Sequence, residues 1–210
     1  MAVSFDLFGT LVRVDAPADP SATVARQLRE RDVPVPDDFA AVYRKPHVDV
    51  SDGAEVPLSA HVDAALASCG IEASETVIRR AVLAAFDPEV ERRPSATAAI
   101  EAARGVGPVG VLSNCSVTGL VERTLISADL EDAFDAVVAS VDCGWRKPDP
   151  RAFGAIADRL GVGVDELLHV GDDPATDGGA PDAGAEALLL SDVPLDSVPE
   201  TLRRRPEVRR

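Results

Sequence analysis

Five short apolar runs recur along the chain, and each is followed by Gly, Ser, Asn or Asp before a stretch with helical spacing. Strands that alternate with helices in this way predict an α/β fold, a doubly wound parallel sheet with right-handed crossovers and helices on both faces. Two of the runs, AVVA and ALLL, are continuously apolar, as strands buried on both faces are. The predicted strands are 2–7, 108–116, 133–140, 167–173 and 185–191, and the predicted helices lie near 95–104, 117–127, 150–160 and 174–183.

Residues 15–93 interrupt this pattern because they contain no strand-like run. They hold helical stretches punctuated by prolines and by Gly70. These stretches lie near 21–31, 36–46, 57–69 and 74–86. We therefore expect two units, a core built from 1–14 and 94–210 and a helical insert at 15–93.

The charge balance limits the possible partners. The 210 residues carry 36 acidic side chains against 21 basic ones, for a net charge of −15, and the lysines are Lys45 and Lys147 alone. Nucleic acid is a poor partner for such a chain, because its binding depends on neutralised phosphates. An acid-rich, lysine-poor composition predicts a high-salt cytoplasm, in which carboxylates hold water and salt screens their repulsion. A melting temperature that rises with KCl would support this expectation.

The same sequence argues against a membrane-bound or secreted protein. No apolar run approaches the roughly 18 residues that span a bilayer, and residues 1–12 lack the basic start and the cleavage site of a secretory signal. Cys69, Cys115 and Cys143 are scattered without metal-ligand spacing, so we expect reduced thiols in a cytoplasmic protein. The basic tail at 203–210 is expected to be a mobile terminus. The sequence indicates no oligomeric state.

Reactive side chains follow four of the predicted strands. In a doubly wound sheet, ligands bind beyond the carboxyl ends of the strands, so these groups are expected to meet there. Taken singly, each could be a helix cap or a turn residue. Together they supply a carboxylate, hydroxyls, a cation and a carboxylate pair. They are Asp6 and Thr10, then Ser113 and Asn114, then Arg146 and Lys147, then Asp172 and Asp173, with Asp177 one turn later.

Four segments of the chain, DLFGT, LSN, RKPDP and VGDDPATD, resemble in order the four motifs of the haloacid dehalogenase-like (HAD) hydrolase superfamily. The resemblance covers the whole chain. It implies a Rossmann-like HAD core, and the insert at 15–93 resembles the helical cap domain that some members carry between the first and second motifs. It also implies a hydrolase that acts on a small molecule.

The resemblance assigns a role to each strand-end residue. Asp6 would be the nucleophile, and its covalent intermediate would divide one hard displacement into two easier ones. Thr10 and Ser113 would hydrogen-bond the transferring group, and Asn114 would help to bind the substrate. Lys147 would neutralise charge on the nucleophile and on the phosphoryl oxygens.

A phosphoryl substrate would also require Mg²⁺, a hard cation that prefers oxygen ligands. The resemblance implies that Asp6, the backbone carbonyl of Phe8 and Asp172 hold the ion, with Asp173 supporting it from the second layer. Asp177 would orient Lys147 and its loop, with a direct contact to the metal as the less favoured alternative.

Phe8 departs from the family pattern DxDGT, whose second Asp protonates the leaving oxygen and later activates water. Loss of a positioned acid or base costs about 10²–10⁴-fold in rate. The leading interpretation is a Mg²⁺-dependent phosphatase of a small phosphorylated metabolite, restricted to good leaving groups or using another base. A metal-independent 2-haloacid dehalogenase is an alternative, because halide leaves without a proton; Arg44 would then grip the substrate. A phosphate-binding protein with little catalysis is the third possibility.

Overall fold

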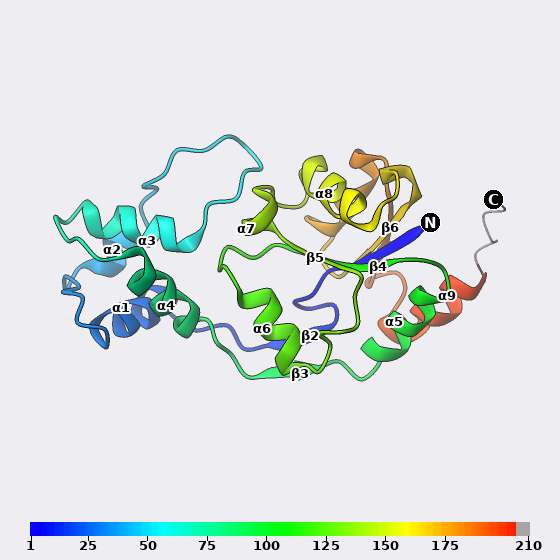
Figure 1. The fold of residues 1–210 in the computed structure, drawn as a ribbon, viewed down its shortest axis with the longest axis horizontal. Helices are drawn as coiled ribbons and strands as arrows, with labels where there is room; N and C mark the ends of the chain where they lie inside the picture. Colours follow the sequence, from blue (N-terminus) through cyan, green and yellow to red (C-terminus); the bar gives the residue numbers. More distant parts are fainter. Residues whose placement is uncertain (205–210) are drawn as a thin grey trace.

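The computed structural model describes residues 1–204. Five parallel strands form one sheet in the order β5-β4-β1-β6-β7 (Figure 1). The predicted α/β class is confirmed, and each predicted strand is present in a shorter form because its polar ends lie in loops. The strands are β1 (Ala2–Phe5), β4 (Val109–Ser113), β5 (Ala136–Ala139), β6 (Leu167–Gly171) and β7 (Glu186–Leu189).

β1 lies at the centre of the sheet, between β4 and β6. Because all three strands run in the same direction, their carboxyl ends lie side by side at one edge. The chain leaves β1 toward β4 on one side and returns later to β6 on the other, which makes this edge a switch point of the kind where ligands bind in open α/β sheets.

The two faces of the sheet are covered by different helices, as the alternation of side chains along a buried strand requires. In β4, Val111 packs into the cluster that includes α5 and α6, whereas its neighbour Leu112 packs into the cluster that includes α8. Covering the first face are α5 (Ala96–Arg104), α6 (Leu120–Ser127) and α9 (Val198–Arg204), and covering the second are α8 (Pro150–Leu160) and η2 (Asp177–Ala183).

Segment η2 is a 3₁₀ helix, whereas the sequence predicts an ordinary helix at 174–183. Pro181 lies within it, and Gly178 and Gly179 precede that proline. Proline removes a backbone donor and glycine weakens helical structure, so this segment stays short and tight. The remaining short elements are α7 (Ser140–Cys143), η1 (Val164–Glu166) and η3 (Leu195–Ser197).

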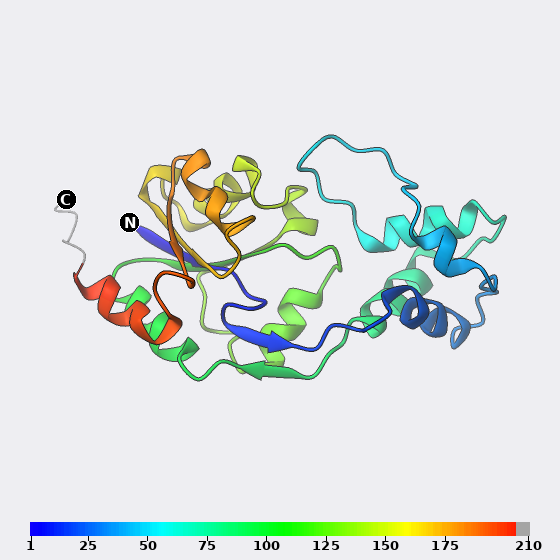
Figure 2. The ribbon, with the colours of Figure 1, turned by 180° about the vertical axis from the view of Figure 1, so that it is seen from behind.

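The helical insert (residues 15–93) contains four helices that pack together beside the sheet (Figures 1 and 2). Asp19 caps the first and Ser74 caps the last through their side chains. The second helix is shorter than the predicted 36–46, because Pro46 follows it closely and Pro36 precedes it. The four are α1 (Pro20–Arg29), α2 (Phe39–Tyr43), α3 (Leu58–Ala67) and α4 (Glu75–Ala85).

Two short strands that the sequence does not predict connect the insert to the sheet. β2 (Val12–Val14) and β3 (Val90–Arg92) pair antiparallel, so the outgoing and returning segments lie side by side (Figure 2). Each strand has three residues, too few for an alternating pattern to be recognised. The division into a core and a cap, with boundaries at residues 14 and 94, stays a prediction.

The sequence predicts a mobile tail at 203–210, but the first two of these residues, Arg203 and Arg204, are helical and end α9. Val198 and Leu202 of this helix are buried against the sheet layer. Residues 205–210 lie outside the described part of the chain. Within residues 1–204, the helices are too short and too polar to cross a bilayer.

Candidate active site

The side chain of Lys147 lies between two carboxylates at the carboxyl edge of the sheet. Its Nζ is 2.8 Å from Asp6 Oδ1 and 2.6 Å from Asp177 Oδ1. The Lys147 side chain is 1% exposed, and those of Asp6 and Asp177 are 11% and 2% exposed. Asp6 lies 141 positions before Lys147 in the chain, and Asp177 lies 30 positions after it. The three residues form one buried ion-pair group, here called the Lys147 cluster.

Asp6 is held at the end of β1 by the sheet and by the turn that follows. Its backbone N–H donates to the carbonyl of Val170, 2.8 Å away, and the Leu7 carbonyl accepts the N–H groups of Leu11 and Val12. Gly9 has φ +90°, and a Cβ there would lie 2.5 Å from Asp172 Oδ2. The turn therefore requires glycine for its backbone conformation and for the close approach of Asp172.

Thr10 and Asp172 join the two central strand ends. The Thr10 hydroxyl donates to Asp172 Oδ1 at 2.7 Å, and Thr10 is fully buried whereas Asp172 is exposed. The predicted contact between Thr10 and a transferring group stays a prediction; here its hydroxyl orients the Asp172 carboxylate.

Below the Lys147 cluster lies a buried histidine. His169 Nε2 is 3.0 Å from Asp177 Oδ1 and 3.5 Å from Lys147 Nζ, and its Nδ1 is 2.8 Å from Ser4 Oγ. Gly171 leaves the space for this arrangement, since a Cβ there would overlap the Asp177 carboxylate.

The pKa values in the cluster are shifted by burial and by neighbouring charges. Burial raises the pKa of Asp6 to about 6 against the pull of Lys147, and the charges of Asp177 and Asp172 raise it as well. Burial alone would raise the pKa of Asp177, but its hydrogen bond with His169 and the charge of Lys147 lower it below the ordinary value. Burial, with Lys147 nearby, lowers the pKa of His169 to about 4. At neutral pH His169 is therefore neutral, and its Nε2–H donates to ionised Asp177.

The loop that carries Lys147 is attached to the loop after β4. The Lys147 N–H donates to Asn114 Oδ1 and the Lys147 carbonyl accepts from Asn114 Nδ2, both at 2.8 Å. The predicted substrate-binding residue Asn114 therefore uses both ends of its amide to hold Lys147 in place.

A segment of the helical insert braces the same loop from the other side. The Glu55 N–H donates to the Gly144 carbonyl and the Arg146 N–H donates to the Gly53 carbonyl, both at 2.9 Å. Glu55 Oε2 accepts from Arg146 Nη1 at 2.7 Å and from the buried hydroxyl of Ser140, and the Glu55 side chain is only 3% exposed. A nearly buried carboxylate thus connects the insert to the residue before Lys147.

Three carboxylates of the site lie close enough to share a cation. One oxygen each of Asp6, Asp172 and Asp177 lies within 4.8 Å of the others. Carboxylate oxygens suit Mg²⁺, and one ammonium does not balance three carboxylates, so the donor set fits a divalent cation. Asp173 lies outside this group: its Oδ1 accepts the Ala175 N–H at 2.8 Å.

Ser113 is a second indication that this edge of the sheet binds a ligand. Its side chain is fully buried at the end of β4, and its hydroxyl has no hydrogen-bond partner among residues 1–204. A buried hydroxyl without a partner costs free energy, and a ligand at the strand ends would remove that cost.

The family model described as haloacid dehalogenase-like hydrolase matches residues 1–184. The chain belongs to this family. A protein from Rhodospirillum rubrum named phosphoglycolate phosphatase is 34% identical to this HAD-like hydrolase over 202 residues, which cover 90% of this chain and 79% of that protein. A protein from Mycobacterium tuberculosis named as a phosphatase is 42% identical over 98 residues, covering 46% of this chain and 45% of that protein, so the match spans less than half of either.

Among solved structures, a 2-haloacid dehalogenase from Pseudomonas syringae matches this HAD-like hydrolase with a TM-score of 0.71 and 24% identity. The match covers 97% of this chain and 98% of that one. This likeness shows the shared fold.

Two predicted site residues of this HAD-like hydrolase are not members of the Lys147 cluster: Arg44 lies apart from it, and Phe8 lies beside it. Arg44 is exposed, and its charge contributes to lowering the pKa of Asp19 at the start of α1; among residues 1–204 no hydrogen bond or ion pair joins it to the cluster. Phe8 is partly buried against the apolar core, two residues after Asp6.

Sequence reasoning missed three contributors to the site. His169 of β6 contacts both Lys147 and Asp177. Arg93 Nη1 donates to the Gly9 carbonyl at 2.6 Å, and Glu55 braces the Lys147 loop. A polar residue within the apolar run LLHV was a usable signal for His169. Contacts of Arg93 and Glu55 depend on tertiary structure alone.

Proposed function

We propose that this HAD-like hydrolase is a Mg²⁺-dependent phosphatase that transfers the phosphoryl group of a small phosphorylated metabolite to Asp6 and then to water. The observation that carries the proposal is the excess of negative charge at the site. Oxygens of Asp6, Asp172 and Asp177 lie within 4.8 Å of one another, and the ammonium of Lys147 pairs with Asp6 and Asp177. A site for halide displacement has no need of this carboxylate excess, whereas a site that binds a divalent cation and a phosphoryl group does.

The residues that would hold Mg²⁺ are Asp6, Asp172 and the backbone carbonyl of Phe8, with Asp173 as an outer support. Asp177 is left to Lys147 and His169, which already occupy its Oδ1. When bound, Mg²⁺ supplies charge that neutralises phosphoryl oxygens and aligns them with the nucleophile.

The protein's own groups supply the remaining steps. A carboxylate oxygen of Asp6 attacks phosphorus, the bond from phosphorus to the leaving oxygen breaks, and the leaving oxygen departs with the electron pair. Lys147 stabilises negative charge on Asp6 and on the transferring group, and the unpartnered hydroxyl of Ser113 donates to a phosphoryl oxygen. Water then attacks phosphorus and releases Asp6.

Phe8 limits the substrates that react well. An aromatic side chain cannot protonate the leaving oxygen, so that oxygen must take its proton from water or leave as a stable anion. We therefore expect acyl phosphates and other activated phosphates to turn over faster than simple alkyl phosphates. The phosphatase names of two relatives, one of them aligned over most of the chain, support the reaction class.

A 2-haloacid dehalogenase is the second candidate, and Phe8 is the observation that favours it, because a departing halide needs no proton. Arg44, which would grip the substrate carboxylate in that reaction, is exposed, and its charge acts on Asp19 at the start of α1. The acidic group around Asp6 also has no purpose in that reaction. A phosphate-binding role with little catalysis is the remaining alternative.

One assay panel separates the three. We would measure phosphate release from acetyl phosphate and p-nitrophenyl phosphate, and chloride release from 2-chloropropionate, each at high salt with and without Mg²⁺. The proposal predicts Mg²⁺-dependent phosphate release that is abolished by Asp6→Asn and retained by Asp192→Asn, a matched change at an exposed carboxylate. Chloride release that is indifferent to EDTA would replace the phosphatase with a dehalogenase. Phosphate or vanadate binding without any turnover would favour the third interpretation.

A further inference from the structure

A groove lies between helix α4 of the insert and the loop that leads into α6. Its volume is about 230 Å³, and it is lined by Thr76, Arg79, Arg80, Leu83 and Thr118. Four of these residues come from α4, and Thr118 comes from the sheet side of the molecule. The groove therefore has walls in both units.

The two arginines in this groove have few partners within the protein. Among residues 1–204, Arg80 takes part in no ion pair, and Arg79 pairs only with Glu75, at 4.0 Å. That pair is weak, because the side chains of Arg79 and Glu75 are 53% and 84% exposed. In a chain with a net charge of −15, two neighbouring arginines that line one groove and share a single weak ion pair make that groove locally positive, which favours an anionic ligand.

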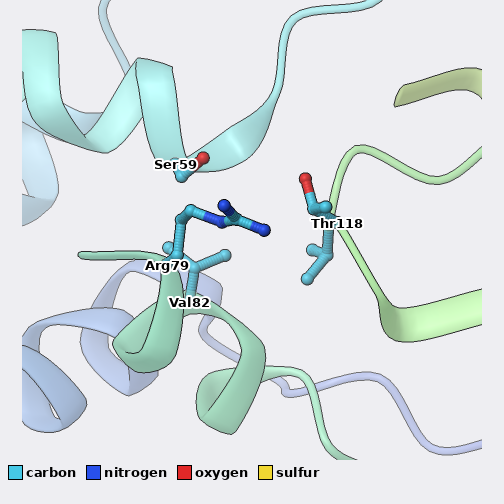
Figure 3. A pocket seen from close by; sticks show the side chains of 5 residues that line it. Ser59, Arg79, Val82 and Thr118 are labelled. Atoms are coloured by element: carbon cyan, nitrogen blue, oxygen red, sulfur yellow. The ribbon is translucent and has the colours of Figure 1, made fainter. Parts of the chain in front are cut away.

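The direction of the Arg79 side chain supports the same conclusion. Figure 3 shows it reaching from α4 toward Thr118, with Ser59 on the neighbouring helix. Helix α6 begins two residues after Thr118, at Leu120, and no side chain caps its first turn. Guanidinium groups, hydroxyls and free backbone N–H groups are the donors that bind oxyanions.

We propose that this groove binds the oxyanion of a small molecule, a phosphate, sulfate or carboxylate group, between Arg79 and Arg80 on one side and Thr118 on the other. The bound group contacts both the insert and the sheet layer and holds them together. Asp6 is not among the residues that line the groove, so the inference does not depend on the proposed phosphatase activity.

The test is a titration of the full chain with inorganic sulfate, in which the melting temperature reports binding. NaCl keeps the ionic strength constant throughout the titration. A parallel titration with succinate shows whether the groove prefers a tetrahedral anion or a carboxylate. The double variant Arg79→Gln/Arg80→Gln should weaken the apparent Kd of the preferred anion at least tenfold. The variant Arg203→Gln/Arg204→Gln removes the same charge from two exposed residues at the end of α9, at the opposite end of the molecule, and should leave the Kd within twofold (Figures 1 and 2).

Two further variants separate binding in the groove from loss of the fold and from binding at the Lys147 cluster. Arg79→Lys/Arg80→Lys keeps the charge and should recover part of the lost affinity, which a variant that merely unfolds α4 would not allow. Asp6→Asn should leave the Kd within twofold. Sulfate stabilisation that is unchanged in Arg79→Gln/Arg80→Gln, or that increases in Asp6→Asn, would place the anion at the Lys147 cluster or reflect a general salt effect, and would overturn the proposal.

Discussion

Replacement of Lys147 by Met tests the electrostatics of the site without any assumption about the reaction. Methionine keeps the length and much of the volume of lysine but removes the ammonium. At contact distances of 2.8 and 2.6 Å, each attraction is about 6 kcal/mol before desolvation is subtracted, with an effective dielectric constant of about 20. Because the group is buried, loss of one partner leaves uncompensated carboxylates, and such losses cost about 3–5 kcal/mol of unfolding free energy.

The assay is urea unfolding followed by circular dichroism at pH 7.5 and one fixed KCl concentration. We expect Lys147→Met to lower the free energy of unfolding by about 3–5 kcal/mol. Lys45→Met is the matched control, since Lys45 is the other lysine of the chain and is exposed, and its effect should stay within about 0.5 kcal/mol.

The pH dependence of the Lys147→Met effect has a definite sign. The folded-state pKa of Asp6 is about 6, above its usual 3.8, and removal of Lys147 raises it further because the ammonium lowers it. A raised folded pKa means that folding favours the protonated carboxyl, so the variant regains stability as the pH falls from 8 toward 5.5. A Lys147→Met variant as stable as Lys45→Met, or a deficit that grows as the pH falls, would refute this account of the cluster.

Three further predictions concern neighbouring residues. Phe8→Asp should raise kcat for alkyl phosphates, which have poor leaving groups, at least tenfold more than kcat for p-nitrophenyl phosphate, which has a good one. The measurement is kcat across a leaving-group series, and equal effects would mean that Phe8 does not occupy the place of the missing acid. Glu55→Gln should lower the free energy of unfolding by about 1–3 kcal/mol because Arg146 loses a buried partner, whereas Glu200→Gln at an exposed helical pair should change it by less than about 0.5 kcal/mol in the same urea assay. Burial raises the pKa of the Cys115 thiol to about 11, so at pH 8 iodoacetamide should label exposed Cys69 and spare Cys115 in mass spectra of the native protein.

Local pattern was sufficient to predict the strands and most of the helices. Each of these parallel strands is a mostly apolar run that must be covered on both faces, and this requirement is visible in the sequence. The 3₁₀ form of 177–183 and the three-residue strands β2 and β3 depend on a proline, on glycines and on pairing between distant segments. Such features are too short for periodicity to show.

The strand-end residues were predictable for a related reason, because parallel strands deliver their following residues to one edge. What the sequence could not show is the partner of each group. Asn114 holds Lys147, and Thr10 holds Asp172, although the resemblance suggested contact with the substrate in both cases. Glu55 lies 91 positions before Arg146 in the chain, and only the folded insert brings it to that loop.

The central claim is that Asp6 attacks the substrate and becomes covalently attached to its phosphoryl group. The most direct test is rapid acid quenching of the protein during turnover of acetyl phosphate, followed by mass spectrometry of the peptide that contains Asp6. The account predicts a phosphorylated Asp6 peptide that requires Mg²⁺ and is absent in Asp6→Asn. Phosphate release that continues in Asp6→Asn, or a phosphoryl group found on a different residue, would contradict it.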